Sequence, residues 1–321
     1  MRFLDFSIRA WREGPYLQAI AHATPAGSMR QPVATRLGVF SSADYRLPID
    51  CTLKSGAELG RQLARVLFPT EVWQLFGESL QLIGSHPNLG LRLRLCLDDD
   101  LIDLPWEFLY RRDVDAEAAR SGFVLADERI SLVREPASIV VNRIADDAVQ
   151  QGLFLGTFFD DDSDGWAVRA EYASLEKALR PLKNLMSLRF ENTAASVKVE
   201  EALAAGCSVF HYAGHVDLDG DRATLVQLAG VRALRAIDQS QGLPSVEALA
   251  KRAPWAHSDE LALRLVRAGT RLAVFNACNS GFWPFVRPLL HAGVPAVVGV
   301  QGLVSNLAAL NVARTNCLTN V

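Results

Sequence analysis

Two short apolar runs constrain the fold of this 321-residue chain more than any other feature. One spans residues 207–215 and the other residues 272–281, and both are rich in β-branched and aromatic side chains. Both are too short for a typical helix and stop at small residues, which is typical of interior strands of a parallel sheet. From residue 152 onward, strand-like and helix-like segments alternate, so we expect an α/β fold with helices on the faces of a parallel sheet.

Each of the two predicted strands ends at a side chain that can take part in catalysis. His215 ends the first run, and Cys278 lies near the end of the second. The residues between them suffice for a loop, a crossover helix and the second strand, which would bring the two strand ends side by side. An imidazole near a thiol raises the thiolate fraction at neutral pH, and the thiolate is the nucleophile. The pair therefore predicts a cysteine nucleophile assisted by a histidine base.

The residues around these positions resemble a known family. His211-Tyr-Ala-Gly-His215 and Asn276-Ala-Cys-Asn-Ser-Gly281 resemble the two active-site strands of the CHAT family, caspase-like cysteine peptidases related to separases, metacaspases and caspases. Segments 104–110 and 123–133 look like those that lead into the peptidase sheet of that family. The resemblance covers most of the chain. It implies a caspase-like, mostly parallel sheet flanked by helices and preceded by an α+β N-terminal region.

The resemblance also implies a function and its catalytic residues. Cys278 would attack a peptide carbonyl and His215 would protonate the leaving amine, so the chain is expected to be a cysteine endopeptidase. The N–H groups of Cys278 and of Gly214 or Val216 would stabilise the oxyanion. Many relatives have glycine where this chain has Val216, and valine disfavours positive φ. The alternative is therefore a caspase-like scaffold without activity that works as a protein-binding module.

The turn after the cysteine and the second histidine of the motif allow two further expectations. Ser280 and Gly281 suit a turn whose amides point at a developing oxyanion. His211 competes with His215 for the role of base, but about 13 Å separates residues four apart on a strand, so only one can reach the thiol. His215 ends the strand, and we expect His211 to be a packed histidine with a backbone partner.

The acidic run at residues 160–164 has three possible interpretations. It can be a solvated loop. By resemblance to caspase-like proteases, it can line the substrate pocket, where Asp160 or Asp161 would select Arg or Lys before the scissile bond through a charge-assisted contact. It can also bind calcium, although its spacing does not match an EF-hand loop.

Trp106 and Glu107 have two interpretations, either as the wall of a binding pocket or as a core side chain and a helix-start residue. The second is favoured.

Composition excludes several other classes of function. The formal net charge of −3 gives no electrostatic argument for direct nucleic-acid binding. The five cysteines are scattered, without a CxxC or Cys/His cluster, so we expect neither a metal site nor a disulfide framework, and a reducing cytoplasm fits. No nucleotide-binding motif is present, and we expect no cofactor. No apolar run is long enough to span a membrane.

By resemblance, the partners are a protein substrate and a regulatory protein in a bacterial defence or cell-death pathway.

The N-terminal half has its own pattern. We expect an accessory α+β region at 1–147 and the caspase-like catalytic domain at 148–321. The accessory region should contain a hairpin, two helices and further strands, at 3–8 and 16–21, 55–68 and from 69, and 91–97 and 130–133. Relatives usually continue past the helix expected from residue 307, so the catalytic domain is either truncated at its C-terminus or atypically short.

Overall fold

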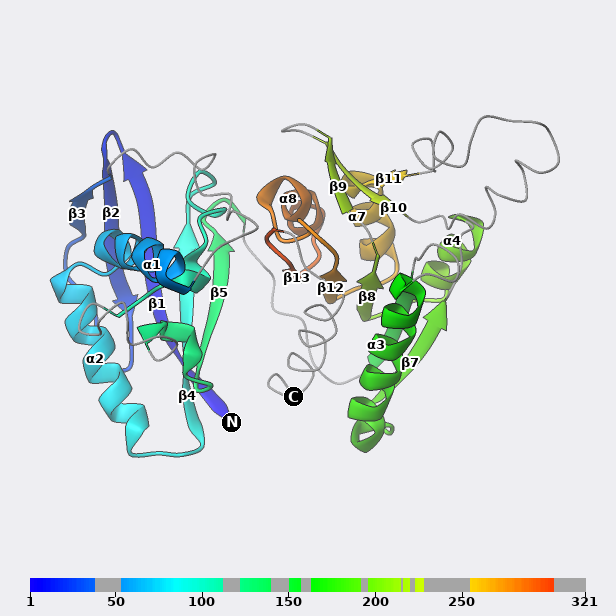
Figure 1. The fold of residues 1–321 in the computed structure, drawn as a ribbon, viewed down its shortest axis with the longest axis horizontal. Helices are drawn as coiled ribbons and strands as arrows, with labels where there is room; N and C mark the ends of the chain where they lie inside the picture. Colours follow the sequence, from blue (N-terminus) through cyan, green and yellow to red (C-terminus); the bar gives the residue numbers. More distant parts are fainter. Residues whose placement is uncertain are drawn as a thin grey trace. The chain divides into compact units, whose positions relative to one another are not determined.

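The structure is a computed structural model that describes residues 1–37, 53–111, 122–139, 150–156, 163–191, 196–214, 216–219, 223–227 and 255–302. The chain divides into two compact units, Met1–Val140 and Val141–Val321, which Figure 1 colours from blue to green and from green to orange. The domain boundary expected at residue 147 lies in the segment 140–149, outside the described residues.

The first unit is built on a mixed sheet. Among its described residues, five strands lie in the order β3-β2-β1-β4-β5, with β1 parallel to β4, β4 parallel to β5, and the remaining pairs antiparallel. The elements are β1 (Arg2–Glu13), β2 (Tyr16–Ala23), β3 (Val33–Arg36), α1 (Leu53–Leu67), α2 (Thr70–Gly84), β4 (Leu89–Leu97), η2 (Trp106–Phe108), η4 (Val124–Ala126) and β5 (Ile130–Pro136). The hairpin, both helices and the strands at 91–97 and 130–133 are confirmed.

The two faces of this sheet differ in chemistry because side chains alternate along each strand. The leucines of β4 from Leu91 to Leu97 are buried, and the edge-to-face rings of Phe6 and Phe76 join β1 to α2 on that side. The opposite face bears charge: Arg94 pairs with Asp5 of β1 at 3.0 Å. Strict alternation in the sequence of β4 therefore separates a helix-covered face from a polar one.

The second unit contains a parallel sheet. In its described part, five strands lie in the order β13-β12-β8-β6-β7, and all four neighbouring pairs are parallel. A separate antiparallel sheet has the order β11-β10-β9. The elements are β6 (Gln150–Gly156), α3 (Ser163–Leu179), η5 (Arg180–Leu182), β7 (Met186–Glu191), α4 (Ser196–Ala204), β8 (Val209–Ala213), β9 (Val216–Asp219), β10 (Ala223–Gln227), β11 (Trp255–His257), α7 (Ser258–Arg267), β12 (Leu272–Asn276), α8 (Trp283–Ala292) and β13 (Ala296–Gly299).

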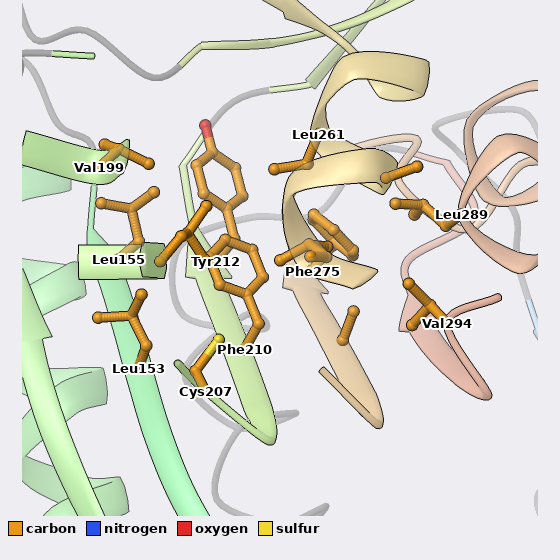
Figure 2. Close-up of a cluster of buried hydrophobic side chains, with 14 of the residues drawn as sticks. Leu153, Leu155, Val199, Cys207, Phe210, Tyr212, Leu261, Phe275, Leu289 and Val294 are labelled. Atoms are coloured by element: carbon orange, nitrogen blue, oxygen red, sulfur yellow. The ribbon is translucent and has the colours of Figure 1, made fainter. Parts of the chain in front are cut away.

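Helices cover both faces of the parallel sheet. On one face, Phe210 and Tyr212 of β8 and Phe275 of β12 form a core with side chains of α4, α7 and α8 (Figure 2). On the other face, Phe154 of β6 packs with α3, which contributes Val168. The expected α/β fold, a mostly parallel sheet flanked by helices after an α+β region, is confirmed.

The alternation of strands and helices expected from residue 152 onward begins with β6, and the residues that follow it, 157–162, lie outside the described part of the chain. The helix expected from residue 307 also lies outside it. Within the described ranges, no helix has both the length and the apolar character needed to cross a membrane.

Candidate active site

The order of the parallel strands defines where a site can form. The chain runs from β6 to β7 on one side and then crosses to β8 on the other side of β6. Such a reversal opens a crevice at the carboxyl ends of the two strands that flank it, and ligands of open α/β sheets bind there. The strands meet at this edge in register, because Ala213 of β8 pairs with Gly156 of β6 and with Asn276 of β12.

The two predicted catalytic residues follow neighbouring strands at this edge. Cys278 comes two residues after Asn276 of β12, and His215 comes two residues after Ala213 of β8, the strand partner of Asn276. Cys278 is half-buried. His215 itself lies outside the described residues, as do Asp160 and Asp161 in the segment between β6 and α3.

Gly214 and Val216 flank the position of His215 and are described. Val216 begins β9, is 6% exposed and packs into the same core as Phe210 and Tyr212. Among the described residues, the one non-glycine with positive φ is Asn279, so Val216 has a φ that a β-branched residue readily adopts. The valine at this position therefore fits its backbone without strain.

The turn after Cys278 is fixed by the segment that follows β13. The amide of Asn279 donates to the carbonyl of Gly302 at 2.9 Å, and that of Gly281 to the carbonyl of Val300 at 2.9 Å. The amide of Ser280 donates within the turn, to the carbonyl of Ala277 at 3.3 Å. The expectation that the amides of Ser280 and Gly281 point at an oxyanion is therefore wrong, because both already have backbone acceptors.

Asn279 takes an unusual conformation directly after the cysteine. Its φ is +62°, in the left-handed region that most side chains avoid and that asparagine tolerates better than other residues. Non-glycine residues in this region cluster at active sites and ligand clamps, where surrounding contacts hold them in place. The contacts here are the hydrogen bonds of the turn, and they set the direction in which the chain leaves Cys278.

His211 is buried, as expected, but its partner is different. Its Nε2 lies 2.6 Å from a carboxylate oxygen of Glu171 on α3, and both side chains are almost fully enclosed. Its ring also stacks on Phe154, with centroids 4.8 Å apart and an interplanar angle of 11°. The expected backbone partner is therefore wrong: the facing helix supplies a carboxylate. This pair joins α3 to the strand that precedes His215.

The two remaining described cysteines are Cys207 and Cys96. Burial raises the pKa of the Cys207 thiol, which lies 3.3 Å from the hydroxyl of Thr270. Burial also raises the pKa of Cys96 on β4. A raised thiol pKa means less thiolate at neutral pH, so neither residue has the surroundings of a nucleophile. Cys51 and Cys317 lie outside the described residues.

The structure also decides between the interpretations of Trp106 and Glu107. Trp106 is fully buried, and its Nε1 donates to the carbonyl of Leu101 at 2.9 Å. Glu107 lies in the first turn of η2 and pairs with Arg134. Core packing and a helix-start role are therefore confirmed. In the ranges that the structure describes, no three His, Cys, Asp or Glu side chains are grouped so that they could hold a metal ion.

Sequence reasoning missed three contributors to this region. Glu171 gave no local signal, because its partner comes from a strand 40 residues away. The left-handed conformation of Asn279 could have been suspected from an asparagine in a short turn. Gly299, at the end of β13, lies against the backbone of Ser280 and Gly281. A glycine at the end of an apolar strand often marks such a close approach of another backbone, so this contact could have been suspected.

A parallel sheet with this strand order, helices on both faces and a cysteine just after an inner strand defines a caspase-like α/β protein. The family model described as the CHAT domain matches residues 57–317, most of the chain, so the chain belongs to the CHAT domain family, which is related to caspase-like cysteine peptidases. The match begins in α1 and therefore includes strands of both units. No curated protein matches the chain.

Proposed function

We propose that the chain is a cysteine endopeptidase in which Cys278 is the nucleophile and His215 the general base and acid. The observation that carries this proposal is the pairing of Ala213 with Asn276, because the two residues directly precede the dipeptides that end at His215 and Cys278. Membership of the CHAT family supports the same assignment.

The chemistry follows from these two side chains. The thiolate of Cys278 adds to the carbonyl carbon of the scissile peptide, and the carbonyl oxygen becomes an oxyanion. Collapse of this intermediate breaks the C–N bond, and the leaving amine takes a proton from the imidazolium of His215. Water, deprotonated by the neutral imidazole, then attacks the thioester; the acyl group leaves as a carboxylic acid, and the thiolate of Cys278 and the imidazolium of His215 are restored. The N–H groups of Cys278 and of Gly214 or Val216 are the proposed oxyanion donors.

We also propose a preference for a basic residue before the cleaved bond. Asp160 and Asp161 belong to the connection between Gly156, where β6 ends, and α3. Gly156 pairs with Ala213, so this connection leaves the sheet beside the strand that precedes His215. A carboxylate at this edge would select Arg or Lys through a charge-assisted hydrogen bond.

A panel of fluorogenic peptides that varies the residue before the cleaved bond tests the proposal. Cys278→Ala and His215→Ala should each abolish cleavage, whereas Cys207→Ala, which removes a buried thiol just before β8, should retain it. Activity that survives both of the first two substitutions would end the proposal. Asp160→Ala and Asp161→Ala should reduce turnover of basic peptides selectively, and an equal loss on all peptides would exclude these residues from specificity.

The second candidate function is an inactive scaffold that binds a protein. It rests on the family resemblance, by which many relatives have glycine at the position that Val216 occupies in this chain. Alkylation of the thiols by a small electrophile at mildly acidic pH distinguishes the two functions. A nucleophilic Cys278 should react faster than the other four cysteines, whereas indistinguishable rates would favour the scaffold.

As part of the same proposal, a separate protein activates the chain. The proposed location is the cytoplasm, and the proposed process is a bacterial defence or cell-death pathway. These proposals rest on the family resemblance. Cleavage by the purified chain that does not rise when a lysate of the native cell is added would argue against such an activator.

A further inference from the structure

We propose that Ser280 is a positioning residue that orients the proposed oxyanion donor, the N–H of Cys278. This inference rests on the proposed function, because it concerns the same site. It assigns a role to a buried hydroxyl that neither attacks the substrate nor transfers a proton.

The Ser280 hydroxyl is enclosed among three backbone groups. The side chain is fully buried. Its Oγ lies 2.7 Å from the carbonyl oxygen of Ala277 and 2.8 Å from that of Phe275, and it accepts a hydrogen bond from the amide of Val300 at 3.0 Å. Because the amide of Val300 uses a lone pair of the oxygen, the hydroxyl proton is directed toward the two carbonyl groups.

One of these carbonyl groups belongs to the peptide unit that carries the proposed oxyanion donor. The carbonyl of Ala277 and the N–H of Cys278 are the two ends of a single planar peptide. In a trans peptide the two groups point in opposite directions, so a hydrogen bond that fixes the carbonyl also fixes the direction of the N–H. A hydrogen bond to the carbonyl also polarises the peptide and strengthens its N–H as a donor.

The end of β13 also holds the turn that contains Ser280. A Cβ atom added at Gly299 would lie 2.4 Å from the carbonyl oxygen of Ser280 and 2.7 Å from the amide nitrogen of Gly281, so the two backbones are in direct contact. The hydrogen bonds from Asn279 to Gly302 and from Gly281 to Val300 join the same two segments. The Ser280 side chain joins these backbone contacts to the Ala277–Cys278 peptide.

The experiment compares Ser280→Ala with Ser280→Thr, which retains the hydroxyl, and with a control, Ser79→Ala. Ser79 is also fully buried and donates to a backbone carbonyl, that of Leu75 at 2.7 Å, but it lies on α2 of the first unit. Two rates are measured for each variant: peptide cleavage, which passes through an oxyanion, and alkylation of Cys278 by iodoacetamide, which does not.

Ser280→Ala should lower kcat by about 10- to 100-fold, somewhat less than the loss of a whole oxyanion donor, and leave KM within about twofold. Alkylation of Cys278 should stay within about twofold of the original rate, since the thiol itself is untouched. Ser280→Thr should recover most of kcat, and Ser79→Ala should change neither rate. A peptide aldehyde, whose adduct with the thiol also presents an oxyanion, should bind Ser280→Ala more weakly by a factor similar to the loss in kcat.

Two results would overturn the inference. One is an unchanged kcat in Ser280→Ala. The other is a loss of alkylation in parallel with the loss of cleavage, which would mean that the hydroxyl only supports the fold. Slow alkylation of the buried Cys207 checks that each variant is folded. If Ser280→Ala exposes Cys207, and so is not folded, the same test is made by comparing kcat of Ser280→Thr, which retains the hydroxyl, with kcat of Ser280→Cys, which does not. Equal values of kcat would then overturn the inference. Failure of the proposed function is a separate result, namely cleavage that persists in Cys278→Ala.

Discussion

Replacement of Gly299 by alanine tests how closely β13 packs against the turn of Cys278. A Cβ atom at this position would lie 2.4 Å, 2.6 Å and 2.7 Å from three backbone atoms of Ser280 and Gly281. Real Cβ atoms do not come this close to other heavy atoms, and backbone atoms cannot move aside as a flexible side chain can. Relief of the overlap therefore requires a main-chain shift, which costs about 1–3 kcal/mol in a well-packed region.

The same substitution has an opposing effect through the unfolded chain. Alanine restricts the unfolded backbone and stabilises the folded state by about 0.4–1 kcal/mol where the native conformation allows it. Gly299 has no positive φ, so this gain applies, and the net change is a loss of roughly 0–2.6 kcal/mol, with a central value of about 1.3 kcal/mol. Gly77 is the matched control, because it lies inside α2 with no atom within 4 Å of an added Cβ. Gly77→Ala should stabilise the first unit by about 0.5–1 kcal/mol.

Hydrogen exchange followed by mass spectrometry measures both effects. Peptides from β8 report on the second unit and peptides from β4 on the first, which matters because a chain of two units need not unfold in one step. The opening free energy of β8 should fall in Gly299→Ala, and that of β4 should rise in Gly77→Ala. If Gly299→Ala stabilises β8 as Gly77→Ala stabilises β4, the reasoning about the close backbone approach is refuted.

Three further predictions follow from single side chains. Glu171→Ala should destabilise the second unit by about 1–3 kcal/mol, because it leaves the buried ring of His211 without an acceptor. Glu171→Gln should cost less than half as much, and equal decreases in the opening free energy measured by hydrogen exchange would contradict this. Asn279→Val should lower stability by about 1–2 kcal/mol relative to Asn279→Gly, since valine is strained at positive φ; thermal unfolding that ranks the two equally would refute it. Because burial raises the pKa of Cys207, its thiol should stay protonated up to a higher pH than the thiol of free cysteine, and its alkylation should stay slow over the same range. A pH profile of alkylation that coincides with that of free cysteine would be inconsistent with its burial.

The fold of the second unit could be predicted from local patterns in the sequence. The runs at 207–215 and 272–281 are apolar because β8 and β12 are inner strands with helices on both faces, and such strands need no polar side. The short strands β3, β9, β10 and β11 were not predicted. Their pairing depends on residues elsewhere in the chain, and segments of three to five residues have little pattern of their own.

The site was predictable where it depends on strand ends and not where it depends on side-chain packing. The placement of Cys278 follows from an apolar strand that stops two residues before it. The expected role of the Gly281 amide was wrong because the sequence does not show that the end of β13 reaches this turn, and that of the Ser280 amide because it donates within the turn, to Ala277. The partner of His211 was wrong for the same kind of reason, since Glu171 faces it from α3, which η5, β7 and α4 separate from β8 in the chain.

The proposed dyad can be tested by the distance between Sγ of Cys278 and the nearer imidazole nitrogen of His215 in a crystal structure of the chain. We expect a separation within about 4 Å, because a general base must lie within hydrogen-bond reach of the thiol or slightly beyond it before substrate binds. A separation greater than about 8 Å, or an imidazole on the opposite face of the sheet from Asn276, would contradict it, since no single peptide bond could then contact both groups.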